Sequence, residues 1–215
     1  MRSITSTRLR RTILPASYAI YITGLAVSTI TFFHNKQFDP TTALLSDLAS
    51  PVGNPHGHLA LAVATVLTAI LFIPATVIFH QCLQKSRLSL IATISFSAGI
   101  VAAILIAALA PITGVDSALH IQLAYAAFTG IILGTTLYLI AARASHTIIT
   151  LQIVVLLFLI WEYFGLGPDL LTGTHLFNSL AFCEWTLCLD CAIALWILAI
   201  AVERHQAHAK ETLSQ

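Results

Sequence analysis

Six long apolar stretches constrain this chain more than any other feature of its sequence. A membrane-spanning helix needs about 20 mostly apolar residues. Only 9% of the residues are charged, against roughly 25% in a soluble domain, so the chain lacks the charges that a water-facing surface needs. We predict one all-α domain over residues 1–215, a polytopic integral membrane protein built as a six-helix bundle. The expected spans are roughly Ile13–Phe33, Gly57–His80, Leu88–Ala110, His120–Ala142, Thr147–Phe164 and Asn178–Val202.

The distribution of basic residues predicts the orientation of the bundle. With six spans, almost all of them lie on one side of the membrane, and the positive-inside rule makes that side cytoplasmic for both termini. Lys36 alone lies on the other side. The net charge of +1 argues against a nucleic-acid partner, which favours a basic face. The basic residues on the predicted inner side are Arg2, Arg8, Arg10, Arg11, Lys85, Arg87, Arg143, Arg204 and Lys210.

The longest connection, from His34 to His56, lies on the predicted outer side. Thr41 or Thr42 is a suitable N-cap for a short helix that continues to about Ala49. Three leucines would share one face of that helix. We therefore expect the segment to lie flat in the outer interface or to fold back over the bundle. The three leucines are Leu44, Leu45 and Leu48.

A carboxylate and a histidine stand four residues apart at the start of the fourth stretch, Asp116 and His120. On one helical face, the carboxylate can fix the histidine tautomer, as in general-base and metal-ligand arrangements. In the competing interpretation, Asp116 only caps the helix and His120 lies at the head-group level.

Further polar residues lie near the start of the second stretch. Ser46, Asp47, Asn54 and His58 are expected at the same membrane depth as His120. If the protein holds a metal, His58, Asp116 and His120 are its candidate ligands, although their spacing is not a known zinc motif and the cofactor stays open. We expect Asp47 or His58 to lie within direct or one-water hydrogen-bond reach of Asp116 or His120.

The sixth stretch carries two carboxylates, Glu184 and Asp190. Ionisable groups inside a span are costly and usually face the bundle interior or a cavity. The two point about 120° apart on a helix, so they need not share a site. In the alternative interpretation each is a carboxyl hydrogen-bonded to a neighbouring helix. Cys188-x-x-Cys191 lies mid-helix without the fold that a redox motif needs, so we interpret these cysteines as packing residues.

Several of these residues resemble a known family. The string Leu45-Ser46-Asp47-Leu48, then Gly53-Asn54-Pro55 before the second stretch, His120, and the pair Glu184-Trp185 resemble the six-span Frag/DRAM/Sfk superfamily and its bacterial relatives of unknown function. Ala49 stands where that family often has glycine. The resemblance implies a link to membrane lipids, a bacterial inner (plasma) membrane location, and Ser46, Asp47, His120 and Glu184 as positions to test.

Four functions follow as hypotheses, with protein partners left open. The first is a lipid-associated or regulatory membrane protein with an outward-facing polar cleft. The second is an intramembrane enzyme acting on a lipid or lipid-linked substrate, with His120 and Asp116 as general base, Glu184 as acid or ligand, and Ser46 as nucleophile. In either case Asn54, His58 and Asp190 are candidate ligand-binding residues.

The two other hypotheses are a haem-binding electron carrier and a small transporter. Haem would be ligated by His58 with His120 near one face and by His80 with His146 near the other. These histidines fall at or beyond the hydrocarbon edges, where haem would be poorly buried. A transporter is disfavoured because the sequence shows no inverted repeat or broken helix.

Overall fold

The computed structural model describes residues 8–33, 44–83, 86–113, 118–161 and 180–214, and within these ranges the chain is helical, with no strand. The predicted all-α fold is therefore confirmed. A π-helical turn, η1, leads into the first long helix, and a single 3-10 turn, η2, precedes the second. The elements are η1 (Leu9–Ile13), α2 (Leu14–Phe33), η2 (Ser46–Ala49), α3 (His58–Cys82), α4 (Arg87–Thr113), α5 (Ala118–Ala141), α6 (His146–Trp161) and α8 (Leu180–Ser214).

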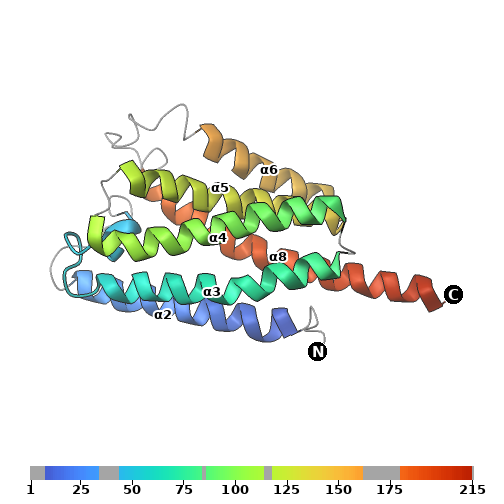
Figure 1. Ribbon diagram of the computed structural model, residues 1–215, viewed down its shortest axis with the longest axis horizontal. Coiled ribbons are helices and arrows are strands. Elements are labelled where there is room, and N and C mark those ends of the chain that lie inside the picture. The colour runs from blue at the N-terminus through green and yellow to red at the C-terminus, as the bar shows by residue number, and fades with distance from the viewer. Residues whose placement is uncertain (1–7, 34–43, 84–85, 114–117, 162–179, 215) are drawn as a thin grey trace.

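The long helices lie alongside one another as a bundle in which α4 lies between α3 and α5 (Figure 1). The helix α8 packs against α5 and α3 and extends past the bundle at its C-terminal end. An ion pair joins Arg10 Nε of η1 to Glu203 Oε2 of α8 at 2.6 Å. The beginning of α2 and the last part of α8 therefore lie at the same end of the bundle, which we call the termini end; η2 lies at the other, which we call the η2 end.

Five of the described helical segments are long and apolar enough to cross a membrane, namely Leu9–Phe32, His58–Cys82, Arg87–Ile112, Ala118–Ala141 and Ala181–Ala209. Their outward faces carry large apolar side chains, as on α3, where Val63, Leu67, Ile70 and Val77 are all about half exposed. The opposite face of α3 is buried and combines small or polar residues such as Ala64 and Thr68 with large ones such as Phe72 and Phe79. A bundle that is apolar on its outside is suited to lipid rather than water.

Two helices continue beyond the ends predicted for their spans. The helix α4 does not stop at Ala110 but includes Pro111 and ends at Thr113, because a proline in the last turn removes only one backbone hydrogen bond. The helix α8 does not stop at Val202 but continues to Ser214. The apolar stretch ends at Val202. The residues that follow are good helix formers and include no glycine or proline, so the helix continues into water.

Two glycines bring α4 and α5 into close contact. A β-carbon on Gly130 would lie 2.6 Å from the Cα of Gly99, and one on Gly134 would lie 2.7 Å from the Cβ of Phe96. Gly130 and Gly134 form a G-x-x-x-G step, which lets two helix backbones approach within a membrane. This contact fixes the rotation of both helices and so decides which of their side chains face inward.

The largest core cluster occupies the termini end of the bundle. Tyr138 of α5 is fully buried, its ring 5.3 Å from that of Phe79 and 6.2 Å from that of Phe96. Its hydroxyl lies 2.7 Å from Thr93 Oγ1 and donates to the carbonyl of Thr76 at 3.3 Å. Large aromatic side chains thus pack closely in this half of the bundle.

Candidate functional site

The segment that carries η2 is fastened to the bundle by a buried polar network. The fully buried Asn54 donates from Nδ2 to the carbonyls of Ser28 at 2.8 Å and Leu48 at 3.2 Å. Ser28 of α2 in turn donates from Oγ to the carbonyl of Gly57 at 2.7 Å and accepts from the Leu61 N–H at 3.0 Å. Asn54 thereby joins α2, η2 and the start of α3, so the structure gives it a positioning role.

Apolar contacts hold η2 down over the end of the bundle. Leu45 and Leu48 are buried in a cluster with Phe32 of α2 and Leu61 of α3, and Trp185 of α8 packs against the same cluster. The segment therefore folds back over the bundle, which was one of the two arrangements expected from its leucines. This placement directs Ser46, which directly follows Leu45, toward α8.

Ser46 and Glu184 form the central polar contact of the site. The Ser46 backbone N–H donates to Glu184 Oε2 at 3.2 Å, and its hydroxyl lies 3.2 Å from Oε1 and 3.3 Å from Oε2. The two residues are 138 positions apart in the chain. The contact offsets part of the free-energy cost of placing a carboxyl inside a span, because a carboxyl without a hydrogen-bond partner would be strongly disfavoured there.

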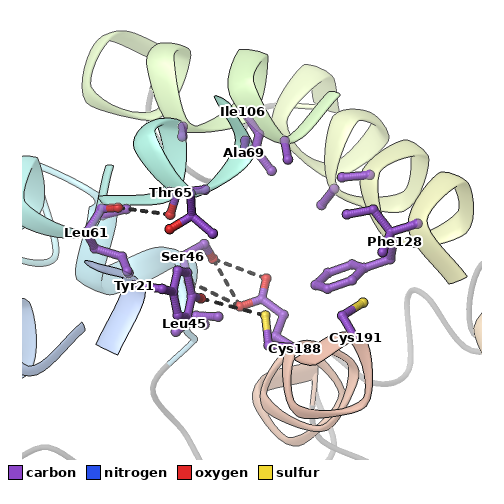
Figure 2. Close-up of a pocket in the computed structure, with 18 of the residues that line it drawn as sticks. Tyr21, Leu45, Ser46, Leu61, Thr65, Ala69, Ile106, Phe128, Cys188 and Cys191 are labelled. Atoms are coloured by element: carbon purple, nitrogen blue, oxygen red, sulfur yellow. Dashed lines mark hydrogen bonds between the residues drawn. The ribbon is translucent and has the colours of Figure 1, made fainter. Parts of the chain in front are cut away.

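A cavity of about 240 Å³ lies directly beside this pair, between α2, α3, α4, α5 and α8. Figure 2 shows Ser46, Leu45 and Tyr21 on one side of it, Phe128 on the opposite side, and Cys188 and Cys191 on α8. It is larger than the ~150 Å³ engineered cavity that holds a benzene-sized molecule. Its walls are mainly alanine and larger aliphatic side chains, with alanines contributed by α3, α4 and α5.

The polar groups along the cavity walls are largely committed to the protein itself. Tyr18 donates to the carbonyl of Ala192 at 2.6 Å, Thr65 to that of Leu61 at 2.9 Å and Thr68 to that of Ser17 at 3.2 Å. Tyr21 donates to Cys188 Sγ at 3.8 Å. Because of these pairings, most of the cavity wall is apolar. The polar pair Ser46 and Glu184 lies at one end of it.

Three of the candidate catalytic residues, Ser46, Glu184 and His120, line this cavity. The His120 side chain is buried near the start of α5. Asp47 is directed elsewhere: its Oδ2 accepts from the Leu44 N–H at 3.1 Å and closes the turn that begins η2. Asp116 lies outside the described residues, so its pairing with His120 stays a prediction.

The remaining candidates have local partners. His58 Nδ1 lies 3.1 Å from the carbonyl of Asn54, at the start of α3. Asp190 Oδ1 accepts from Gln152 Nε2 of α6 at 2.9 Å, so it joins two helices, while Glu184 faces the cavity. The expected contact of Asp47 or His58 with Asp116 or His120 stays a prediction.

The metal and haem hypotheses concern histidines at both ends of the bundle. Within the described ranges, no group of three or more His, Cys, Asp or Glu side chains is arranged to hold a metal ion; Asp116, one of the three candidate ligands, falls outside them. His80 Nδ1 lies 3.0 Å from Ser89 Oγ of α4. The described cysteines are all free thiols, Cys82, Cys183, Cys188 and Cys191.

The sequence analysis did not identify the cavity walls. Ala103, Ala107 and Ala110 of α4 recur at helical spacing and line the cavity together with Ala124 and Ala127 of α5. Such a stripe of small residues was visible in the sequence, but small residues also serve close helix packing. Tyr18 and Tyr21 were likewise missed, because tyrosine in a span is usual in an aromatic belt.

Comparison of the chain with protein-family models, with curated proteins and with solved structures finds no match. The function is therefore argued from the cavity and from the polar pair at its end. An apolar cavity with a few convergent polar groups is the usual form of a small-molecule site.

Proposed function

We propose that this protein is a multi-pass membrane protein that binds a single-chain amphiphilic lipid. The apolar chain of the lipid occupies the cavity, and its polar head meets Ser46 and Glu184. The observation that carries this proposal is the pairing of one polar end with otherwise apolar walls in a single cavity. The membrane itself supplies such molecules, so no path through water is needed.

The hydrogen-bonding capacity of Glu184 selects the kind of head group. A carboxyl group accepts hydrogen bonds in either protonation state and has about four lone-pair sites when it is ionised. Ser46 contacts Oε2 twice and Oε1 once, and the Leu45 backbone also donates to this carboxyl; the proposed head group uses the acceptor capacity that remains. The matching head group therefore carries hydroxyl or amine donors, as in a monoacylglycerol or a long-chain amine.

We further propose six spans with both termini in the cytoplasm. The first support is the distribution of the basic residues. The second is the Arg10–Glu203 ion pair, which joins the start of the first span to the end of the last span. An even number of spans requires these two ends to lie on the same side of the membrane. The described part of α6, His146–Trp161, has 16 residues; it rises about 24 Å and is the shortest of the proposed spans. The resemblance to the Frag/DRAM/Sfk superfamily and the bacterial inner membrane location agree with this proposal and stay expectations.

The topology predicts which introduced cysteines react with an impermeant thiol reagent in intact cells. In a variant without the native cysteines, His56→Cys and Asp169→Cys should be labelled, and Ser86→Cys and Ser214→Cys should not. Ser214→Cys is the sharpest position, because α8 would end outside the cell if α6 did not cross the membrane. Labelling of Ser214→Cys in intact cells would contradict the six-span topology.

Filling the cavity tests the proposed lipid binding. Ala103→Phe places a ring into the cavity from α4, whereas Ala108→Phe places the same ring on the exposed face of the same helix. For protein in nanodiscs, we expect Ala103→Phe to weaken binding of radiolabelled monoacylglycerol at least about tenfold, since overpacking costs about 1–3 kcal/mol. Ala108→Phe should bind as the wild type does. Equal binding by both variants would contradict the proposal.

One observation also favours an enzyme acting on such a lipid: His120 is buried and lines the same cavity as Ser46 and Glu184. A histidine, a hydroxyl and a carboxyl that line one cavity are residue types of general-base or nucleophilic chemistry. A defined lipid product that forms with wild type and not with His120→Ala, at unchanged lipid binding, would establish this second function.

A further inference from the structure

A second hollow lies at the termini end of the bundle, far along α8 from Glu184. It has a volume of about 710 Å³ and is formed by the connection between α5 and α6 together with the C-terminal half of α8. We call it the basic groove, because Arg143 lines it from the connection, and Arg204, His205 and His208 line it from α8. The arginines and His208 are exposed, so a ligand can reach them.

The carboxylate that lies nearest to Arg204 along the chain is that of Glu203. Glu203 directly precedes Arg204, but its Oε2 accepts from Arg10 Nε at 2.6 Å. Glu203 is thus used to fasten η1 to α8. Arg204 and His208 are four residues apart and so lie on one face of α8, while Arg143 approaches from a different element. Cationic groups from two elements converge on one hollow.

The backbone at Arg143 provides a second, independent observation. Arg143 has a φ of 56°, the left-handed conformation that favours glycine. Its N–H bonds to the carbonyl of Ile140 and the Ala144 N–H to that of Leu139, both at 3.0 Å, which is a Schellman ending of α5. Glycine is the usual residue at this position, because a residue with a β-carbon has a higher conformational free energy at positive φ. A favourable interaction of the Arg143 side chain would offset that cost.

The floor of the groove is apolar, formed in part by Ile148 of α6 and by Ile197 and Ile200 of α8. Ser145 also lines the groove, next to the N-terminal end of α6, where the helix dipole favours an anion. The groove therefore combines a cationic rim with an apolar floor at the level where the helices leave the membrane. A phosphate joined to hydrocarbon matches both parts.

We propose that the basic groove binds the phosphate of an anionic lipid head group from the leaflet at the termini end. Arg143 and Arg204 contact the phosphate, and the upper part of an acyl chain lies against Ile197 and Ile200. This site is separate from the cavity beside Glu184 and does not depend on the function proposed for that cavity.

The test uses the full chain in phosphatidylcholine nanodiscs that contain a small fraction of spin-labelled phosphatidylglycerol. Arg143→Gly removes the charge and relieves the left-handed backbone, so it should unfold at the wild-type temperature or above. We expect Arg143→Gly and Arg204→Gln each to weaken the association of phosphatidylglycerol about tenfold, the effect of losing one direct hydrogen bond to a charged phosphate. The control is Arg87→Gln, an exposed arginine that begins α4 and does not line the groove.

Three results would overturn the proposal. If Arg87→Gln lowers the association as much as Arg143→Gly, the effect is diffuse charge at the membrane surface rather than a site. If Arg143→Gly and Arg204→Gln bind as the wild type does, the groove does not contact the lipid. If soluble glycerol phosphate binds to detergent-solubilised protein as tightly as phosphatidylglycerol does, the ligand is a free phosphate compound and the lipid assignment fails.

Discussion

Replacing Glu184 with leucine is expected to weaken binding of a monoacylglycerol by about 10- to 100-fold, since hydrogen bonds to a charged group contribute about 1.5–3 kcal/mol. The variant should still fold and insert, because an apolar side chain removes the cost of placing a carboxyl in a span. Glu184→Gln keeps an acceptor for Ser46 and should fall between the wild type and Glu184→Leu. Binding is measured by scintillation proximity on protein in nanodiscs, with thermal unfolding followed in parallel.

Two controls separate head-group recognition from general damage. Asp190→Leu removes a carboxyl from the same helix, but Asp190 pairs with Gln152 and does not line the cavity, so binding should be unchanged. A fatty-acid methyl ester, which has no donor in its head, should bind the wild type and Glu184→Leu equally. If Glu184→Leu retains wild-type affinity for the monoacylglycerol, Glu184 does not recognise the head group.

The largest effect on stability is expected from Gly130→Leu. A side chain at this position meets the backbone of α4, because even a β-carbon would lie 2.6 Å from Gly99 Cα and 2.8 Å from the Ser95 carbonyl oxygen. Backbone atoms cannot move aside as side chains do, so α4 and α5 must separate. We expect a loss of roughly 3 kcal/mol or more, at or above the upper end of overpacking costs.

The measurement is the thermal unfolding temperature in detergent and the monodisperse fraction after size-exclusion chromatography. Ala126→Leu is the matched control, since Ala126 lies four residues earlier on the exposed face of α5, and it should behave as the wild type. A Gly130→Leu protein as stable as Ala126→Leu would show that the glycine contact does not hold the two helices together.

The helices could be predicted from hydropathy because lipid imposes a length and a composition on each span. The errors fall where this constraint ends. Helix α8 runs past Val202 into a polar sequence that remains helical, and α4 includes Pro111. Neither end is decided by membrane burial, so hydropathy carries no information about it.

The candidate site could be predicted only in part. Glu184 was identified because a carboxyl in a span needs a partner, and Ser46 was singled out by the family resemblance. Their contact joins residues 138 positions apart and depends on how η2 folds back over the bundle. The cavity depends on helix rotation, which the Gly99–Gly130 contact sets. A single sequence does not encode that rotation in its hydropathy, since α4 and α5 are apolar on nearly every face.

The most direct test of lipid binding in the cavity is photo-crosslinking with a monoacylglycerol that carries a diazirine at the last carbon of its chain. The expected adducts lie on Phe72, Ile100 and Leu195, which line the cavity where it meets the main core, and excess unlabelled monoacylglycerol should abolish them. Adducts confined to lipid-facing residues such as Ile70 and Val101, or adducts that persist under competition, would contradict binding inside the bundle.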